Sequence, residues 1–357
     1  MKSSMIVLLG PTATGKTRIA ALLAKAIDGE IISADSRQVY RHMDIGTGKD
    51  LGDYLVDGVQ VPAHLVDIVD AGEKYSLFNY STDFEKAYYD INGRGKVAIV
   101  CGGSGMYIES ALGLYDLKVV PENRSIREFL SEKSNDEIIV LLKTLNKVHN
   151  TTDLLNRKRL IRAVEIALFS AGYSTLGQET YNELLLKASG IRSLNNTSEA
   201  IQGQLALQEQ KPESAYDNKP ATEFIYGLLL PRDEVRARIT ERLHKRLKEG
   251  LIEEVEGLHK SGVSYETLQY YGLEYKYIAL YLEGKLIYQD MVSMLNTAIH
   301  QFAKRQMTWF RRMERRGIVI KWLPSDAEVV IASIKSDLRN AGLLSASALS
   351  DNRIIFF

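Results

Sequence analysis

A phosphate-binding motif near the start of the chain limits the fold more than any other feature of the sequence. Residues 10–17 read GPTATGKT and fit the pattern G-x-x-x-x-G-K-[ST]. In this pattern the glycines let backbone N–H groups converge on a phosphate, the lysine neutralises charge, and the threonine hydroxyl can ligate Mg²⁺. An apolar run at 4–9 precedes the motif, and apolar residues at helical spacing follow it, namely Ile19, Leu22, Leu23 and Ala26. The motif therefore predicts a strand–loop–helix unit that binds an anion at the helix N-terminus.

The rest of the chain predicts an α/β fold. Apolar segments at 30–33, 64–69 and 96–101 alternate with helical patterns, which is typical of a parallel sheet covered on both faces. Beyond residue 121 the pattern is mostly helical, with helices expected at 126–145, 154–169 and 295–316 and strands at 224–230 and 318–322. A long helical block is expected at 234–284, interrupted at Gly250, Gly262 and Gly272. We expect a P-loop NTPase-like parallel sheet with helices on both faces plus a mostly helical inserted domain. The predicted parts are a catalytic core at 1–235, with a helical segment at about 122–170 and a mobile loop at about 189–220, a helical insertion at 236–298, a return to the core at 299–323 and a C-terminal tail at 324–357.

Charge and cysteine content limit the possible partners. The chain of 357 residues carries 45 basic and 45 acidic residues and a single cysteine, Cys101, which excludes an intrachain disulfide and a multi-cysteine zinc site. No apolar run approaches the ~18–20 residues of a membrane-spanning helix, so we expect a cytoplasmic protein. A net charge of zero argues against a nucleic-acid partner only if the charges are mixed, and here the basic residues are clustered. The clusters are Arg157, Lys158, Arg159 and Arg162; Arg232, Arg236, Arg238, Arg242, Lys245, Arg246 and Lys248; and Lys304, Arg305, Arg311, Arg312, Arg315 and Arg316.

A second polar segment follows the second predicted strand. Residues 33–40 read SADSRQVY, and ligands of parallel sheets collect at the carboxyl ends of the strands. Asp35 is then within reach of a reacting atom, while Arg37 and Gln38 could hydrogen-bond a heterocycle. Taken alone, the segment favours a polar turn in which Asp35 caps the next element.

Several collinear segments give the chain a resemblance to the tRNA dimethylallyltransferases, also called tRNA isopentenyltransferases. They are residues 10–17 (GPTATGKT), 33–40 (SADSRQVY), 43–47 (MDIGT), 64–68 (HLVDI), 102–107 (GGSGMY), 159–163 (RLIRA) and 303–311 (AKRQMTWFR). The chain departs from the family at Ser104, where threonine is usual, at Gly48 and Asp50, where alanine and proline are usual, and at His149, Asn150 and Thr151.

The resemblance implies transfer of a dimethylallyl group from dimethylallyl diphosphate to N6 of the adenosine 3′ to the anticodon in tRNA. It implies that Asp35 is the general base, with Lys16 and Ser104 also catalytic, and that Thr17 binds Mg²⁺. The implied donor-binding residues are Gly10, Pro11, Thr12, Ala13, Thr14, Gly15, Lys16 and Thr17. The implied tRNA-binding residues are Asp35, Ser36, Arg37, Gln38, Arg127, Lys158, Arg159, Leu160, Ile161 and Arg162. The expected partner is the anticodon stem-loop, and the expected state is a monomer.

Other interpretations remain at this point. The same chemistry could act on a free adenine nucleotide, and the phosphate loop alone also suits a small-molecule kinase, whereas a non-catalytic RNA-binding module would not need it. Phe302, Trp309 and Met313 lie on one helical stripe, which favours core packing of Trp309 over base stacking. For a group of tyrosines, interhelical packing and contact with the stem-loop are equally favoured: Tyr265, Tyr270, Tyr271, Tyr275 and Tyr277.

Overall fold

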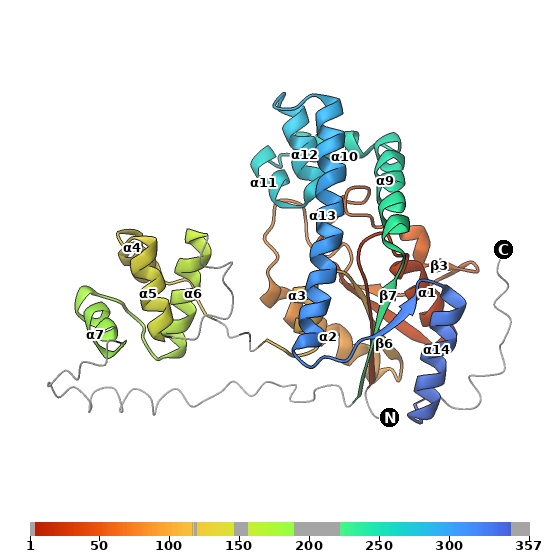
Figure 1. Ribbon diagram of the computed structural model, residues 1–357, viewed down its shortest axis with the longest axis horizontal. Helices are drawn as coiled ribbons and strands as arrows, with labels where there is room; N and C mark the ends of the chain where they lie inside the picture. Colours follow the sequence, from red (N-terminus) through yellow and green to blue (C-terminus); the bar gives the residue numbers. More distant parts are fainter. Residues whose placement is uncertain (1–3, 116, 118–119, 146–155, 189–221, 344–357) are drawn as a thin grey trace. The chain divides into compact units, whose positions relative to one another are not determined.

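The computed structural model describes residues 4–115, 117, 120–145, 156–188 and 222–343 (Figure 1). The chain forms two compact units. We call residues 1–116 with 218–357 the sheet unit, and residues 117–217 the small helical unit. This division differs from the predicted borders, which placed 122–170 within the core. The predicted loop at 189–220 lies outside the described residues.

A six-stranded sheet forms the centre of the sheet unit, in the order β5-β2-β6-β1-β7-β8. Each neighbouring pair is parallel, which confirms the predicted sheet. The strands are β1 (Ser4–Leu9), β2 (Gly29–Ala34), β5 (Ala63–His64), β6 (Val97–Gly102), β7 (Thr222–Leu229) and β8 (Lys321–Pro324). A short hairpin of β3 (Leu55–Val56) and β4 (Val59–Gln60) stands apart from this sheet.

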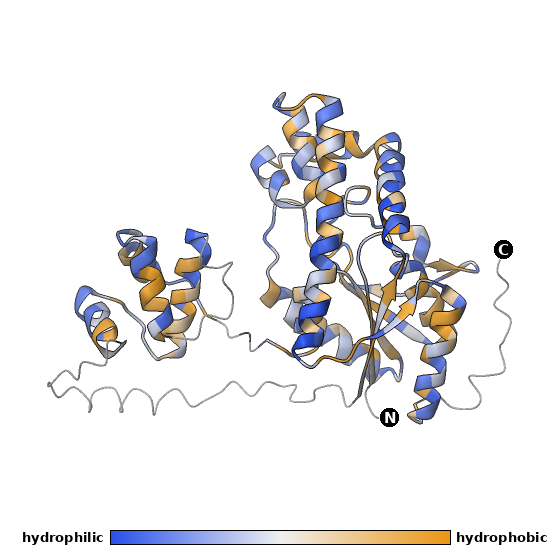
Figure 2. Ribbon diagram, viewed as in Figure 1, coloured by the Kyte–Doolittle hydropathy of each residue, from blue (hydrophilic) through white to orange (hydrophobic). Residues whose placement is uncertain are grey.

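Two helical layers cover the sheet, one on each face. Successive side chains of a strand point to opposite faces, and the apolar strands therefore have apolar side chains to bury on both. Ile6 and Leu8 of β1 join the core beneath α1 (Lys16–Ile27) and α14 (Ala327–Asn340). Val7 and Leu9 join the opposite core, beneath α2 (Leu77–Gly93), α3 (Gly105–Ala111) and the C-terminal half of α13 (Tyr288–Arg315). Figure 2 shows the apolar strands between these layers. The predicted coverage of both faces is confirmed.

A helical layer stands beyond the carboxyl ends of the strands (Figure 1). It contains α9 (Arg232–Lys248), α10 (Leu251–Lys260), α11 (Tyr265–Tyr270) and α12 (Leu273–Leu282), which pack against the N-terminal half of α13. The same core includes Val39, Tyr40 and Met43 from the segment after β2. The long helix α13 therefore belongs to both cores and ties the helical layer to the sheet.

The small helical unit has a core of its own. It contains α4 (Arg124–Ser131), α5 (Asn135–Leu145), α6 (Arg157–Ser170) and α7 (Gln178–Ala188). Ile126, Leu141 and Leu160 are among the apolar side chains that these helices bury together. The predicted helix at 154–169 is present as α6, whereas the predicted helix at 126–145 is two helices, α4 and α5, and α7 was not predicted.

Three expectations about elements are wrong. Residues 64–69 are not a strand beyond His64, because Leu65 and Asp67 adopt positive φ angles of 60° and 56°. The final strand begins at Lys321 instead of residue 318. The expected C-terminal tail contains α14. Asp326 caps the N-terminus of this helix by accepting a hydrogen bond from the N–H of Val329. The helix buries Val330, Ile331, Ile334 and Leu338.

Among the described residues, no helix has the length and apolar character needed to cross a membrane.

Candidate active site

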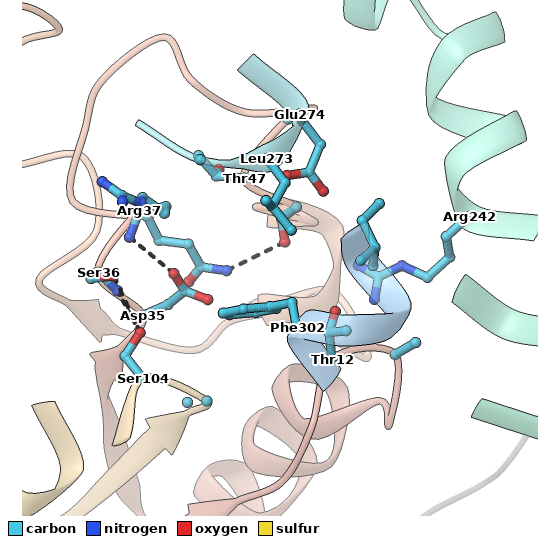
Figure 3. A pocket seen from close by; sticks show the side chains of 18 of the residues that line it. Thr12, Asp35, Ser36, Arg37, Thr47, Ser104, Arg242, Leu273, Glu274 and Phe302 are labelled. Carbon is cyan, nitrogen blue, oxygen red and sulfur yellow. Dashed lines mark hydrogen bonds between the residues drawn. The ribbon is translucent and has the colours of Figure 1, made fainter. Parts of the chain in front are cut away.

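A pocket of about 910 Å³ opens at the carboxyl ends of β1, β2 and β6 in the sheet unit (Figure 3). The phosphate loop, the segment after β2 and the end of β6 line it on the sheet side. Residues of α9, α12 and α13 line it on the helical side. The sequence motifs at 10–17, 33–40 and 102–107 therefore meet in one cavity, at the edge where a parallel sheet binds its ligands.

The phosphate loop ends at a glycine with a left-handed backbone, directly before α1. Gly15 adopts a φ of 72° immediately before α1, a backbone conformation that side chains disfavour. Lys16 Nζ donates to the carbonyl of Pro11 at 2.7 Å, and burial lowers the pKa of Lys16 to about 8. Of the predicted donor-binding residues, the ones that line the pocket are Thr12, Ala13, Gly15, Lys16 and Thr17. The other three residues of the motif, Gly10, Pro11 and Thr14, are buried and do not line the pocket.

Asp35 lies at the base of the pocket, directly after β2. Its Oδ1 accepts a hydrogen bond from the N–H of Arg37 at 2.9 Å, so a local turn fixes the carboxylate (Figure 3). Ser104, at the end of β6, accepts a hydrogen bond from the N–H of Ser36 through Oγ at 3.0 Å. The turn that the polar interpretation predicts is present, and the same carboxylate also lines the cavity.

Arg37 and Gln38 lie on this turn but take different environments. The guanidinium of Arg37 stands over the ring of Tyr270, with 5.6 Å between Cζ and the ring centroid. Gln38 is buried and its amide is used inside the protein: Oε1 accepts from the hydroxyl of Ser33 at 3.1 Å, and Nε2 donates to the carbonyl of Gly48 at 3.3 Å. Gln38 therefore braces the pocket wall, whereas Arg37 lies on its surface.

Two family models match the chain. The family model for IPP transferase matches residues 38–313, and the model for isopentenyl transferase matches residues 3–58. The tRNA dimethylallyltransferase 2 of Porphyromonas gingivalis is 48% identical over 328 residues, which are 91% of this chain and 96% of that protein. This chain belongs to the tRNA dimethylallyltransferase family.

Further relatives of this family agree. The tRNA dimethylallyltransferase 2 of Phocaeicola vulgatus is 47% identical over 322 residues, which are 90% of this chain and 92% of that protein. The crystal structure of the full-length tRNA isopentenylpyrophosphate transferase from Bacillus halodurans is 25% identical and superimposes with a TM-score of 0.60. The match covers 95% of this chain and 96% of the Bacillus halodurans chain. The resemblance and the fold class drawn from the sequence are confirmed.

Gln306 is a pocket residue of this family member to which the sequence analysis gave no role. Its Oε1 accepts from the N–H of Thr12 at 2.8 Å, and its Nε2 donates to the carbonyl of Gly103 at 2.9 Å. The side chain is buried and joins the phosphate loop, the end of β6 and α13. A signal was present, because Gln306 is a polar residue between Ala303 and Phe310 on the buried face of α13.

Two arginines of α9 also face the pocket. Arg242 Nη2 lies 3.4 Å from Oδ2 of Asp50, and burial together with the nearby Arg246 lowers the pKa of Arg242. Arg246 Nη1 lies 4.0 Å from Oε1 of Glu274, whose pKa is raised by burial. The sequence placed both arginines in a basic cluster but not in the site. They add positive charge to the cavity that contains Lys16.

The departures from the family at Gly48 and Asp50 belong to this arrangement. Gly48 adopts a φ of 67°, and a Cβ added there would lie 2.1 Å from Nη2 of Arg246. Asp50 pairs with Arg242. Nη2 of Arg246 is buried and has no hydrogen-bond partner among the described residues. Glycine at position 48 therefore leaves the space that the arginine occupies.

The remaining family segments hold the pocket wall in place. Glu254 accepts hydrogen bonds from the N–H groups of Asp44, Ile45 and Gly46, at 2.8, 2.7 and 3.0 Å. Buried Lys49 pairs with Asp44 at 2.9 Å and also with Asp67. The segment at 43–47 is thus hydrogen-bonded to α10, and Lys49 joins it to the segment at 64–68.

The other predicted tRNA-binding residues belong to the small helical unit. Arg127 and Arg162 both pair with Glu165, which is 1% exposed, so an acidic residue holds part of the basic cluster around Arg162. Leu160 is fully buried in the core of this unit, which leaves its side chain no surface for RNA. Ile161 is half-buried, whereas Lys158 and Arg159 are exposed.

The apolar stripe of α13 divides between core and pocket. Met313 is fully buried. Trp309 is half-buried: it packs against the core beneath α2 and α3, as predicted, and it also lines the pocket. Phe302, on the same stripe, is 38% exposed and lines the pocket (Figure 3). At this level of α13, Ala303 packs in the core of the helical layer while the neighbouring Phe302 faces the cavity.

Proposed function

We propose that this enzyme transfers a dimethylallyl group from dimethylallyl diphosphate to N6 of the adenosine 3′ to the anticodon in tRNA. One observation carries the proposal: a single pocket contains both the phosphate loop and the carboxylate of Asp35. The leaving diphosphate and the proton acceptor for the attacking amine therefore share one cavity. Membership of the family supports prenyl transfer to tRNA over a small-molecule kinase or a non-catalytic RNA-binding module.

The phosphate loop binds the diphosphate of the donor in this proposal. The N-terminus of α1 presents backbone N–H groups, and Lys16 exchanges its bond to the Pro11 carbonyl for a phosphate oxygen. Arg242 and Arg246 approach from α9. As the bond between the allylic carbon and the diphosphate oxygen breaks, these groups stabilise the negative charge that accumulates on the leaving group.

The oxygen donors of the pocket fit a magnesium ion. The hydroxyl of Thr17 lines the cavity together with the carboxylates of Asp35 and Asp53, and Mg²⁺ prefers such oxygen ligands in combination with phosphates and water. We place the ion on Thr17. When bound, it adds a positive charge that offsets the charge of the departing diphosphate.

Asp35 accepts the proton of the adenine amino group. The N6 lone pair forms the new bond to the allylic carbon, the diphosphate leaves with the electrons of the old bond, and one N6 proton passes to the carboxylate. Because Arg37 N–H holds Oδ1, the carboxylate keeps one orientation during the transfer. Positioned proton transfer of this kind contributes roughly 10²–10⁴-fold to the rate.

The tRNA contacts are proposed from exposure and charge. Lys158 and Arg159 in the small helical unit, with Lys304 and Arg311 of α13, are exposed and suit phosphate oxygens of the stem-loop. The proposed state of the protein is a monomer. The proposed compartment is the cytoplasm.

Incubation of the protein with labelled dimethylallyl diphosphate, Mg²⁺, bulk tRNA and AMP tests the proposal. We expect the label at N6 of an adenosine in tRNA. Label in AMP and not in tRNA would instead support transfer to a free nucleotide. Release of diphosphate without labelled nucleoside would contradict both acceptors.

A further inference from the structure

Tyr270 is a large aromatic side chain on the wall of the pocket that faces solvent. It ends α11 and is 72% exposed, whereas its neighbour Tyr271 is 1% exposed and Tyr275 is also buried. Tyr265 and Tyr277 are half-buried. Of the tyrosines in this helical block, Tyr270 is thus the one that packing within the protein does not explain. It lines the same cavity as Asp35.

The support beneath Tyr270 is rigid. Its ring meets the ring of Tyr271 edge-on, with 6.4 Å between centroids and 65° between planes. Tyr271 packs in turn against buried Tyr40 at 4.5 Å, and its hydroxyl accepts from the N–H of Gly72 at 2.6 Å. An aromatic ring held in this way can accept a second ring with little loss of conformational freedom.

Arg37 connects the ring of Tyr270 to the proposed reaction centre. Its guanidinium stands over the ring of Tyr270, and its backbone N–H donates a hydrogen bond to the carboxylate of Asp35, two residues earlier. One short turn thus carries both the proposed general base and the cation on the aromatic ring. A planar group stacked on Tyr270 would lie beside the group presented to Asp35.

We propose that Tyr270 is a stacking platform for one of the two nucleotides adjacent to the target adenosine. The inference rests on the proposed function. An adenine that leaves the stack to reach Asp35 exposes the faces of its neighbours, and single-stranded bases are commonly held by aromatic side chains with arginine on the same surface. Tyr270 is therefore a positioning residue: it fixes the RNA strand next to the base that reacts.

The first test measures kcat/KM for an anticodon stem-loop RNA and for matched RNAs that are abasic at either neighbour of the target. Tyr270→Ala should lower kcat/KM on the intact RNA by about 5- to 150-fold, the range expected for loss of one base–aromatic stack. On one of the abasic RNAs the same substitution should have no further effect. Tyr270→Phe should retain wild-type kinetics, since stacking needs the ring and not the hydroxyl.

Tyr288→Ala is the matched control. Tyr288 is 44% exposed at the start of α13 and does not line the pocket, so its removal should leave kcat/KM unchanged. The affinity of every variant for dimethylallyl diphosphate should equal that of the wild type. An equal loss with Tyr270→Ala on intact and both abasic RNAs, or no loss on any, would overturn the platform.

A binding measurement separates this inference from the proposed function. The probe is stem-loop RNA with 2-aminopurine at the neighbouring nucleotide, whose fluorescence is quenched by stacking. Saturating wild-type protein should quench it, and Tyr270→Ala should leave it brighter, whether or not the protein turns over. Absence of prenyl transfer by the wild type would refute the proposed function alone, while equal emission in both complexes would refute the platform alone.

Discussion

Gly48→Ala is predicted to impair donor binding through Arg246 while it destabilises the fold only modestly. The φ of 67° at this position is a left-handed conformation, which costs a residue with a side chain about 1–2 kcal/mol. The added methyl would lie 2.1 Å from Nη2 of Arg246 and 2.9 Å from its Cζ, so the guanidinium must move. Since the guanidinium is the end of a flexible side chain, the movement adds little to the loss of stability. It does displace a cation from the wall of the diphosphate pocket.

Gly95→Ala separates the two effects. Gly95 has a φ of 73°, and a Cβ there would meet nothing within 4 Å, so this variant carries the backbone strain without the clash. Urea unfolding should give both variants a similar loss of about 1–2 kcal/mol. Only Gly48→Ala should raise the KM for dimethylallyl diphosphate, by roughly 10-fold, within the range for loss of one hydrogen bond to a charged group.

A double-variant cycle locates the effect on the arginine. In an Arg246→Met background the guanidinium that the added methyl would displace is absent. Gly48→Ala should therefore not raise the KM for dimethylallyl diphosphate any further. Two results would refute the reasoning: an unchanged donor KM in Gly48→Ala, or the same increase with and without Arg246.

Three further predictions concern other parts of the molecule. Gln306→Leu removes the hydrogen-bond partners of the Thr12 N–H and the Gly103 carbonyl. It should therefore lower the free energy of unfolding by about 2–4 kcal/mol and also lower kcat/KM. An unchanged urea midpoint would contradict the role of Gln306 in joining the phosphate loop to α13. The KM for dimethylallyl diphosphate should be constant below about pH 8 and rise above it by up to about tenfold per pH unit, because burial lowers the pKa of Lys16 to about 8 and the diphosphate binds the protonated amine. A flat profile from pH 7 to 10 would exclude Lys16 as the titrating group. Arg127→Ala leaves buried Glu165 with fewer partners, so it should speed hydrogen exchange in α6 by lowering the free energy of opening by about 1–3 kcal/mol. Arg124→Ala breaks only an exposed ion pair and should leave the exchange rate unchanged. Equal exchange rates in the two variants would contradict this role of Glu165.

The sequence predicted the sheet and the composition of the pocket floor because both depend on local patterns. The strand and helix on either side of residues 10–17 follow from apolar spacing, and topology brings Asp35 and Ser104 to the same edge of the sheet. The predicted strand at 64–69 failed because its apolar residues serve a turn, with positive φ at Leu65 and an ion pair from Asp67 to Lys49. Nothing local distinguishes that use from a strand.

The roles of individual charged residues depended on contacts distant in sequence. Arg127 was expected to contact RNA, but buried Glu165, 38 positions later, pairs with it and also with Arg162. Gln306 meets the phosphate loop across 294 positions of the chain, a pairing that no pattern in one sequence reveals. The helix α14 could have been found, since Val330, Ile331, Ile334 and Leu338 follow helical spacing.

The most direct test of the central claim is a single-turnover transfer assay on wild-type protein and Asp35→Asn, with saturating dimethylallyl diphosphate and tRNA. The asparagine oxygen can still accept the hydrogen bond from the N–H of Arg37, so the turn should persist while the proton acceptor is lost. The account predicts that wild type forms N6-prenylated adenosine, and that the variant does so about 10²–10⁴-fold more slowly with unchanged affinity for tRNA. An equal rate of transfer in the two proteins would contradict it.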